Sequence, residues 1–209
     1  MQRVAIGRAL VRRPKAMLMD EPIGALDAKL REEMQSELRQ IQRSIGTTTI
    51  LVTHDQHEAM ALSDLIVLMN QGRIEQIGAP HEVYDRPASA FVASFLGKTN
   101  VLAATGDGQG AVNVGGLVLP LPGAGKGPLQ LAVRPERLML AAAGEPGLEA
   151  RITGRVFQGA HWQFSAESAA GALILMRGND GAAVPGEGET VRLRFSAADA
   201  AILPAGAAA

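Results

Sequence analysis

The sequence contains no cysteine and few aromatic residues. None of its 209 residues is Cys, and Phe, Trp and Tyr together make up 3% of the chain. The absence of cysteine excludes disulfides and thiolate metal sites, and it is typical of proteins kept in a reducing compartment such as the cytoplasm.

Excess charge and long apolar runs are missing as well. The formal net charge is −1, so composition gives no reason to expect nucleic acid or an anionic membrane surface as the main partner. The sequence contains no run of about 18 apolar residues, so it predicts no transmembrane helix. Its first eight residues (MQRVAIGR) do not have the apolar core of a secretion signal. The remaining composition is that of a globular protein with one or two domains.

Glycine divides the chain into two parts. Residues 1–98 hold six of the 24 glycines, and residues 99–209 hold the other 18. In the first part, apolar runs alternate with an amphipathic helix pattern over 28–44, which predicts an α/β fold with a mainly parallel sheet. The second part has short alternating strands between glycine-rich turns, which predict an all-β barrel or sandwich. We therefore expect domains at residues 1–97 and 98–209.

Two adjacent carboxylates, Asp20 and Glu21, follow the apolar run at 16–19. Holding two such charges together is costly unless a cation or a reaction requires them. Nucleotide hydrolysis requires both, because one carboxylate holds Mg²⁺ through water while the other orients and deprotonates the attacking water. The alternative is a strand that ends in an acidic helix cap, and the pair alone does not decide between the two.

A histidine, His54, ends the next predicted strand, which covers residues 48–53. Parallel strands place their carboxyl ends at the same edge of a sheet, so Asp20, Glu21 and His54 are predicted to converge on one phosphate group. Taken alone, a histidine in this position is more often a capping or packed residue. Asp55 is expected to cap a helix that ends near Leu62, with Glu58 completing a capping-box-like pattern.

Several segments together resemble the ATP-binding subunit of an ABC importer. They are MQRVAIGRAL at 1–10, DEP at 20–22, GALD at 24–27 and VTHDQHEAM at 52–60, and the likeness continues through 62–80 and 91–97. The branch that it resembles serves polyamine, ferric-iron and sugar importers, whose subunits end in a TOBE domain, an OB-like β-barrel. Here AVRPE at 132–136 and GETVRLRF at 188–195 are similar to that domain.

The resemblance implies roles for four residues and two cofactors, ATP and Mg²⁺. Asp20 matches the Walker B aspartate, which holds Mg²⁺ through water, and Glu21 matches the catalytic base. His54 matches the switch histidine that contacts the γ-phosphate. Asp27 matches the D-loop aspartate, which in the family reaches across a dimer of two such subunits.

The resemblance also implies partners and a location. The expected partners are a second ATP-binding subunit in a homodimer, integral membrane permease subunits and, indirectly, a periplasmic solute-binding protein, with no nucleic acid. Such subunits are peripheral proteins on the cytoplasmic face of the plasma membrane, where they couple ATP hydrolysis to solute uptake. The solute is set by the binding protein and the permease.

Three motifs of the family's ATPase domain are not found: the Walker A loop, the Q-loop glutamine and the LSGGQ signature. Gly97-Lys98-Thr99 is not a Walker A loop, because Val92 stands where the first glycine is required and because it follows the Walker B strand. Met1 stands where the family has the residue after the signature glutamine. We therefore expect an amino-truncated subunit that is inactive alone, and its status as an enzyme stays open.

Two rival functions belong to other classes. One is a catalytically dead remnant whose β domain acts as a binding or regulatory module. The other is a non-transport ABC ATPase of DNA repair or translation, which the β domain and the linker at 91–97 argue against. A metal site built from His54, Asp55, His57 and Glu58 is a weaker hypothesis. We interpret Arg134 as part of a structural turn rather than a ligand contact.

Overall fold

The computed structural model describes residues 7–8, 11, 14–23, 28–142 and 144–204, and it divides into two compact units, Met1–Val83 and Tyr84–Ala209. The division falls ahead of the predicted boundary at residue 97. The reason is that α5 (Ala90–Phe95) packs Ala90 and Ala93 against Ala132 and Leu203 of the second unit. Helix α4 (Pro80–Asp85) spans the division.

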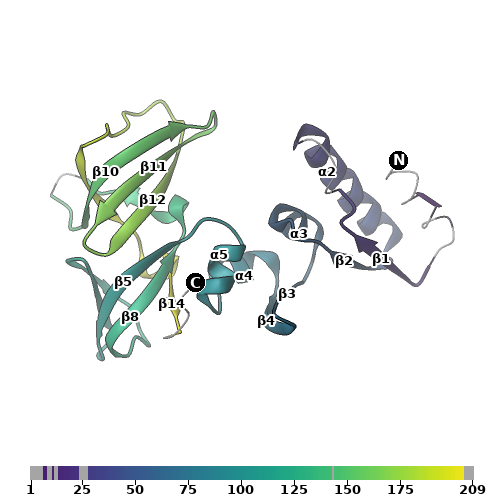
Figure 1. Ribbon diagram of the computed structural model, residues 1–209, viewed down its shortest axis with the longest axis horizontal. Helices are drawn as coiled ribbons and strands as arrows, with labels where there is room; N and C mark the ends of the chain where they lie inside the picture. Colours follow the sequence, from purple (N-terminus) through teal and green to yellow (C-terminus); the bar gives the residue numbers. More distant parts are fainter. Residues whose placement is uncertain (1–6, 9–10, 12–13, 24–27, 143, 205–209) are drawn as a thin grey trace. The chain divides into compact units, whose positions relative to one another are not determined.

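The first unit confirms the predicted parallel strand pair. Strand β1 (Ala16–Asp20) pairs in parallel with β2 (Thr48–Val52), and α2 (Ala28–Ile45) connects them along one side of the pair (Figure 1). Helix α3 (Gln56–Leu62) follows β2 after a short loop. A hairpin of β3 (Ile66–Asn70) and β4 (Arg73–Gly78) completes the unit.

The core of the first unit forms along one stripe of α2. Met34 and Leu38 of that stripe are buried together with Ile23 and with Leu62 of α3. These positions recur at helical spacing, so one face of α2 is apolar and covers one face of the β1–β2 pair. The helix ends before Gly46, whose φ of 66° is easily adopted by glycine.

The opposite face of the β1–β2 pair is apolar and open. Leu18, Ile50 and Val52 are 77%, 54% and 60% exposed, whereas Met17 and Met19 on the covered face are 6% and 8% exposed. The β3–β4 hairpin shows the same asymmetry, with Ile66 and Leu68 buried and these large apolar side chains exposed: Val67, Met69, Ile74 and Ile77. Both sheets of the first unit therefore have one covered face and one apolar face in solvent.

The second unit consists of two five-stranded antiparallel sheets around one core, which confirms the predicted all-β part (Figure 1). One sheet has the order β14-β8-β5-β6-β7, with strands at Ala200–Leu203, Lys126–Val133, Asn100–Asp107, Ala111–Val114 and Leu117–Pro120. The other has the order β12-β11-β10-β13-β9, with strands at Gly171–Gly178, His161–Ser168, Leu148–Phe157, Thr190–Arg194 and Met139–Leu140. Alternate residues of both sheets fill the core, among them Leu102, Leu131, Ile152, Phe164 and Leu193.

A buried arginine, Arg134, fastens the helices to the sheets of the second unit. Its side chain is 5% exposed and donates to the carbonyl oxygens of Tyr84 and Ala93 at 2.9 Å and to Thr99 Oγ1 at 2.8 Å. The guanidinium also lies 3.8 Å from the centre of the Tyr84 ring, and burial lowers its pKa. Arg134 is therefore a structural residue, as the sequence interpretation held.

Tyr84 is tied to the same place by its hydroxyl group. Its Oη donates to Glu136 Oε1 at 2.8 Å, next to the short 3₁₀ helix at Pro135–Arg137. Burial and the hydrogen bond to Glu136 raise the pKa of Tyr84 to about 12.

Among the described helices, none has the length and apolar character needed to cross a bilayer.

Candidate functional site

The parallel register of β1 and β2 brings the acidic pair and the histidine to one edge of the sheet. Asp20 lies beside Val52 in the register, and the backbone N–H of Glu21 donates to the carbonyl oxygen of Val52 at 2.9 Å. His54 follows Val52 by two residues. The predicted meeting of the two strand ends is therefore present in the structure.

Glu21 and His54 contact each other directly through their side chains. His54 Nδ1 lies 2.5 Å from Glu21 Oε1, and the two side chains are 76% and 51% exposed. An ionised carboxylate can only accept, so Nδ1 must carry the proton and donate it. The Nε2 atom of His54 then accepts hydrogen bonds when the ring is neutral and donates when the ring is protonated.

The backbone of Glu21 is held in a left-handed conformation. Its φ is 43°, a value that costs a residue with a Cβ about 1–2 kcal/mol relative to the right-handed region. This bend turns the chain as it leaves β1 and places the Glu21 carboxylate toward His54. Strain of this kind is concentrated at functional sites, where the surrounding structure holds it in place.

Asp20 is exposed at the end of β1, and its carboxylate has no hydrogen-bond partner among the described residues. Mg²⁺ is usually bound through one or two carboxylates together with water and substrate phosphates, so a single free carboxylate fits that ion. The part of the chain that the structure describes contains no group of three or more His, Asp or Glu side chains placed to hold a metal. That finding gives no support to the weaker metal-site hypothesis at residues 54–58. Asp27 lies outside the described residues.

Helix α3 starts as predicted, but the expected capping box is wrong. Asp55 is the N-cap and accepts from the backbone N–H of His57 at 2.8 Å. Glu58 does not reach back to the N–H of Asp55, which donates to Thr53 Oγ1 at 3.0 Å instead. The Glu58 carboxylate points into the protein, where it accepts from the backbone N–H of Ile23 at 3.2 Å and from the Thr53 hydroxyl. Sequence reasoning missed these contacts because a capping-box pattern explained Glu58 equally well.

Two arginines of α2 support the loops at either end of α3. Arg31 forms an ion pair of 3.3 Å with Asp55 at the N-terminus of α3. Arg39 donates to the carbonyl oxygen of Leu62 at 3.0 Å and to Asp64, and its hydrogen bond and charge lower the pKa of Asp64. The polar face of α2 therefore holds both ends of α3 in place through Arg31 and Arg39.

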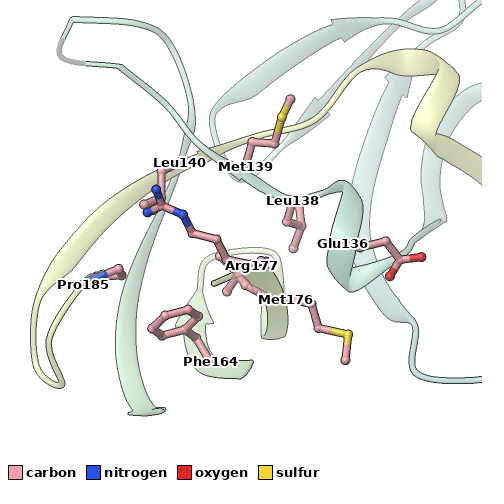
Figure 2. A pocket seen from close by; sticks show the side chains of 10 residues that line it. Glu136, Leu138, Met139, Leu140, Phe164, Met176, Arg177 and Pro185 are labelled. Atoms are coloured by element: carbon pink, nitrogen blue, oxygen red, sulfur yellow. The ribbon is translucent and has the colours of Figure 1, made fainter. Parts of the chain in front are cut away.

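The second unit has a cavity that the sequence did not predict. It has a volume of about 400 Å³ and is lined mainly by apolar side chains, together with Arg177 and Glu136 (Figure 2). Its inner wall is closely packed, since Leu138, Phe164 and Leu175 are 4%, 1% and 4% exposed. Arg177 is engaged already, because it donates to the carbonyl oxygen of Ala183 at 2.9 Å.

Comparison with known proteins relates both units to transport proteins. The TOBE domain family matches residues 131–203. The "Spermidine/putrescine import ATP-binding protein PotA" of Rubrobacter xylanophilus is 43% identical, over 97% of this chain and 57% of that protein. The "Fe(3+) ions import ATP-binding protein FbpC" of Rhizobium etli is 42% identical, over 84% of this chain and 51% of that protein.

The chain is homologous to the ATP-binding subunits of ABC importers. A third relative, the "sn-glycerol-3-phosphate import ATP-binding protein UgpC" of Cereibacter sphaeroides, is 47% identical over 84% of this chain and 51% of that protein. The chain spans about half the length of the curated relatives it matches. Among solved structures, the molybdate-bound cytoplasmic protein ModG aligns with a TM-score of 0.41 and 14% identity, over 50% of this chain and 96% of that one.

Proposed function

We propose that the first unit carries the hydrolytic edge of an ATPase domain that energises solute import. The observation that carries this proposal is the contact between Glu21 and His54 at the end of a parallel strand pair, beside the exposed carboxylate of Asp20. The homology to import ATP-binding subunits supports it. The TOBE domain supports it over a non-transport ABC ATPase.

Each residue of this edge has its own task in the proposed reaction. Glu21 orients the attacking water and accepts its proton, because its carboxylate is half-exposed and held in place by His54. His54 donates to the terminal phosphate through Nε2, the ring atom that Glu21 leaves free, and it does so with the ring protonated at both nitrogens. Asp20 holds Mg²⁺ through water, and the ion supplies charge neutralisation to the phosphates when it is bound.

We also propose the setting in which this edge works. The subunit pairs with a second copy, with Asp27 reaching across the dimer, and binds integral permease subunits at the cytoplasmic face of the membrane. A solute-binding protein delivers the solute to the permease. The three relatives are named for three different solutes, so the homology does not assign one to this chain.

The 209-residue polypeptide alone is proposed to be inactive. Phosphate binding in P-loop ATPases depends on the backbone N–H groups and the lysine of the Walker A loop, and this sequence contains no such loop. Asp20, Glu21 and His54 therefore require a phosphate cradle supplied by further polypeptide. A fusion behind the N-terminal part of the Rubrobacter xylanophilus relative provides one for testing.

The proposed role of Glu21 is tested by Glu21→Gln in that fusion. We expect hydrolysis to fall by about 100-fold or more while ATP binding is retained, because the carboxamide cannot take a proton from water. The matched control is Glu33→Gln, an exposed carboxylate on α2 that should leave both properties unchanged. Equal loss of ATP binding and hydrolysis in Glu21→Gln would instead make Glu21 a structural residue.

A further inference from the structure

Glu58 is a buried charge at an unexpected place. It is 0% exposed, and among the acidic residues that the structure describes it is the buried one. Taking a carboxylate out of water is costly unless several hydrogen bonds compensate for the lost solvation. The partners of Glu58 therefore indicate what the burial achieves.

Those partners lie on the two segments that carry Glu21 and His54. Glu58 Oε1 accepts from the N–H of Ile23, two residues after Glu21, and Oε2 accepts from the hydroxyl of Thr53, which directly precedes His54. One carboxylate thus bridges the exit from β1 and the exit from β2. Thr53 Oγ1 extends the bridge, because it also accepts from the N–H at the start of α3.

The exposed pair needs such support from beneath. Glu21 and His54 are both more than half exposed, and an ion pair in solvent contributes little to holding its two side chains together. The left-handed backbone of Glu21 adds a further cost. The contact between them therefore depends on how firmly the two chain segments are held relative to each other.

We propose that Glu58 is a positioning residue that keeps His54 Nδ1 on the Glu21 carboxylate by bridging the two strand exits. The inference rests on the proposed function, since it concerns the geometry of the same edge. Glu58 would thus belong to the hydrolytic edge although it neither contacts the reacting atoms nor faces solvent. Through it, the orientation of the His54 ring depends on a buried carboxylate in α3.

The test reads the His54 ring in the full 209-residue chain by ¹⁵N NMR at about pH 8, above the ordinary pKa of histidine of about 6.5. A histidine held by a carboxylate at Nδ1 carries its proton there, and a released ring does so less often. The chain has four histidines, and His54→Gln identifies the signal by its loss. No nucleotide is required for this measurement.

Glu58→Ala should release the ring, so that the Nδ1–H form ceases to dominate, whereas Glu58→Gln should retain it because the carboxamide still accepts one of the two bonds. The matched control is Leu62→Ala, one turn later in α3. Leu62 is 3% exposed and packs in the same core, so its loss weakens the helix and leaves the bridge intact. An unchanged signal in Glu58→Ala, or an equal change in Leu62→Ala, would overturn the proposal.

Two further variants keep the result decisive. If Glu58→Ala unfolds α3, the bridge is tested with Thr53→Val and Thr53→Ser instead. Valine keeps the shape of threonine and lacks the hydroxyl group, whereas serine keeps the hydroxyl group and lacks the methyl group. Release of His54 by the valine variant alone supports the bridge, and equal signals in the two variants overturn it.

Glu21→Ala separates this inference from the proposed function. If it leaves the His54 signal unchanged, the Glu21–His54 pair fails and the proposed function loses its main support. If Glu21→Ala releases the ring and Glu58→Ala does not, only the positioning role fails.

Discussion

The two units of this chain differ in how completely they bury their apolar surfaces. In the second unit, two sheets close over a common core, and central side chains such as Leu102, Leu131 and Leu193 are 0% exposed. In the first unit, Leu18 and Val52 lie 77% and 60% exposed on one face of a parallel strand pair. Parallel sheets are normally covered on both faces, and within the described residues this one is covered on one face.

The difference shows that the candidate site belongs to one unit and the completely buried core to the other. Glu21 and His54 sit at the edge of the less completely packed unit, where a buried carboxylate and a few hydrogen bonds hold them. The second unit has its own closed core and carries none of the residues of this edge. Exposed apolar sheet faces of this kind mark surfaces for further protein contact or sites of aggregation.

The largest expected effect comes from separating the units. A polypeptide of residues 84–209 should be monomeric and unfold cooperatively, because its core is complete, whereas residues 1–83 should aggregate or stay loosely folded. Urea unfolding followed by the fluorescence of Trp162, the one tryptophan of the chain, reports the second piece. If residues 1–83 were monomeric and unfolded cooperatively while residues 84–209 were unfolded, the claim that the second unit has the more complete core would be contradicted.

A shorter piece, residues 98–209, sharpens the boundary. It removes the carbonyl acceptors of Tyr84 and Ala93 and leaves the buried Arg134 guanidinium short of partners. We expect it to be less stable than residues 84–209 by about 3 kcal/mol, the scale for stripping a buried charge of its partners. Equal stability of the two pieces would support the domain boundary predicted at residue 97.

Arg134→Met in the whole chain should lower the free energy of unfolding of the second unit by about 3 kcal/mol. The neutral side chain fills the space and leaves buried carbonyl oxygens without donors. Arg137→Met is the matched control, because that side chain is 50% exposed and its ion pairs with Asp85 and Asp199 measure 3.8 and 3.6 Å. It should change stability by no more than about 0.5 kcal/mol. Similar losses in both variants would show that burial of Arg134 does not matter.

The pH dependence of the second unit should follow Tyr84 in alkaline solution. Because the pKa of Tyr84 is raised from 10.0 to about 12, the fold favours the neutral phenol. Its contribution to stability is complete below about pH 10 and is lost as the pH rises through about 12. Tyr84→Phe should remove that part of the pH dependence. Phenolate absorbance reads this residue alone, since the chain has one tyrosine, and an ordinary value near 10 would contradict the burial.

The smallest expected effect is on the open face of the first unit. Leu18→Thr should change stability by no more than about 0.5 kcal/mol, because the leucine is 77% exposed, and it should reduce aggregation. Leu102→Thr in the second unit, where the leucine is 0% exposed, should cost about 3 kcal/mol. Light scattering and urea unfolding measure the two properties. A comparable cost at both positions would mean that the open face is covered.

Sequence patterns predicted the elements whose periodicity is strong. The stripe of α2 and the β-branched run of β2 both follow local rules. Parallel pairing then placed Glu21 and His54 at one edge. Strands β5 and β11 have a weaker local signal, because NVLAATGD and HWQFSAES contain few β-branched residues.

The remaining features depend on contacts between residues far apart in sequence. Glu58 fitted a local capping pattern, and only its bonds to Ile23 and Thr53 show that it bridges two strand exits. From the sequence, Arg134 is interpreted as part of a turn. Its hydrogen bonds to the carbonyl oxygens of Tyr84 and Ala93 join the helices before the β domain to the second unit, which begins at Tyr84. The hydrophobic periodicity of the sequence predicts neither the contacts of Glu58 nor those of Arg134.

The most direct test of the central claim is the response of His54 to nucleotide. In the Glu21→Gln fusion with the N-terminal part of the Rubrobacter xylanophilus relative, ATP with Mg²⁺ should shift the His54 Nε2 signal, because the terminal phosphate lies against that atom. ADP with Mg²⁺ should leave the signal near its nucleotide-free position. Equal shifts with both nucleotides, or none in a fusion that demonstrably binds ATP, would contradict the placement of His54 at the terminal phosphate.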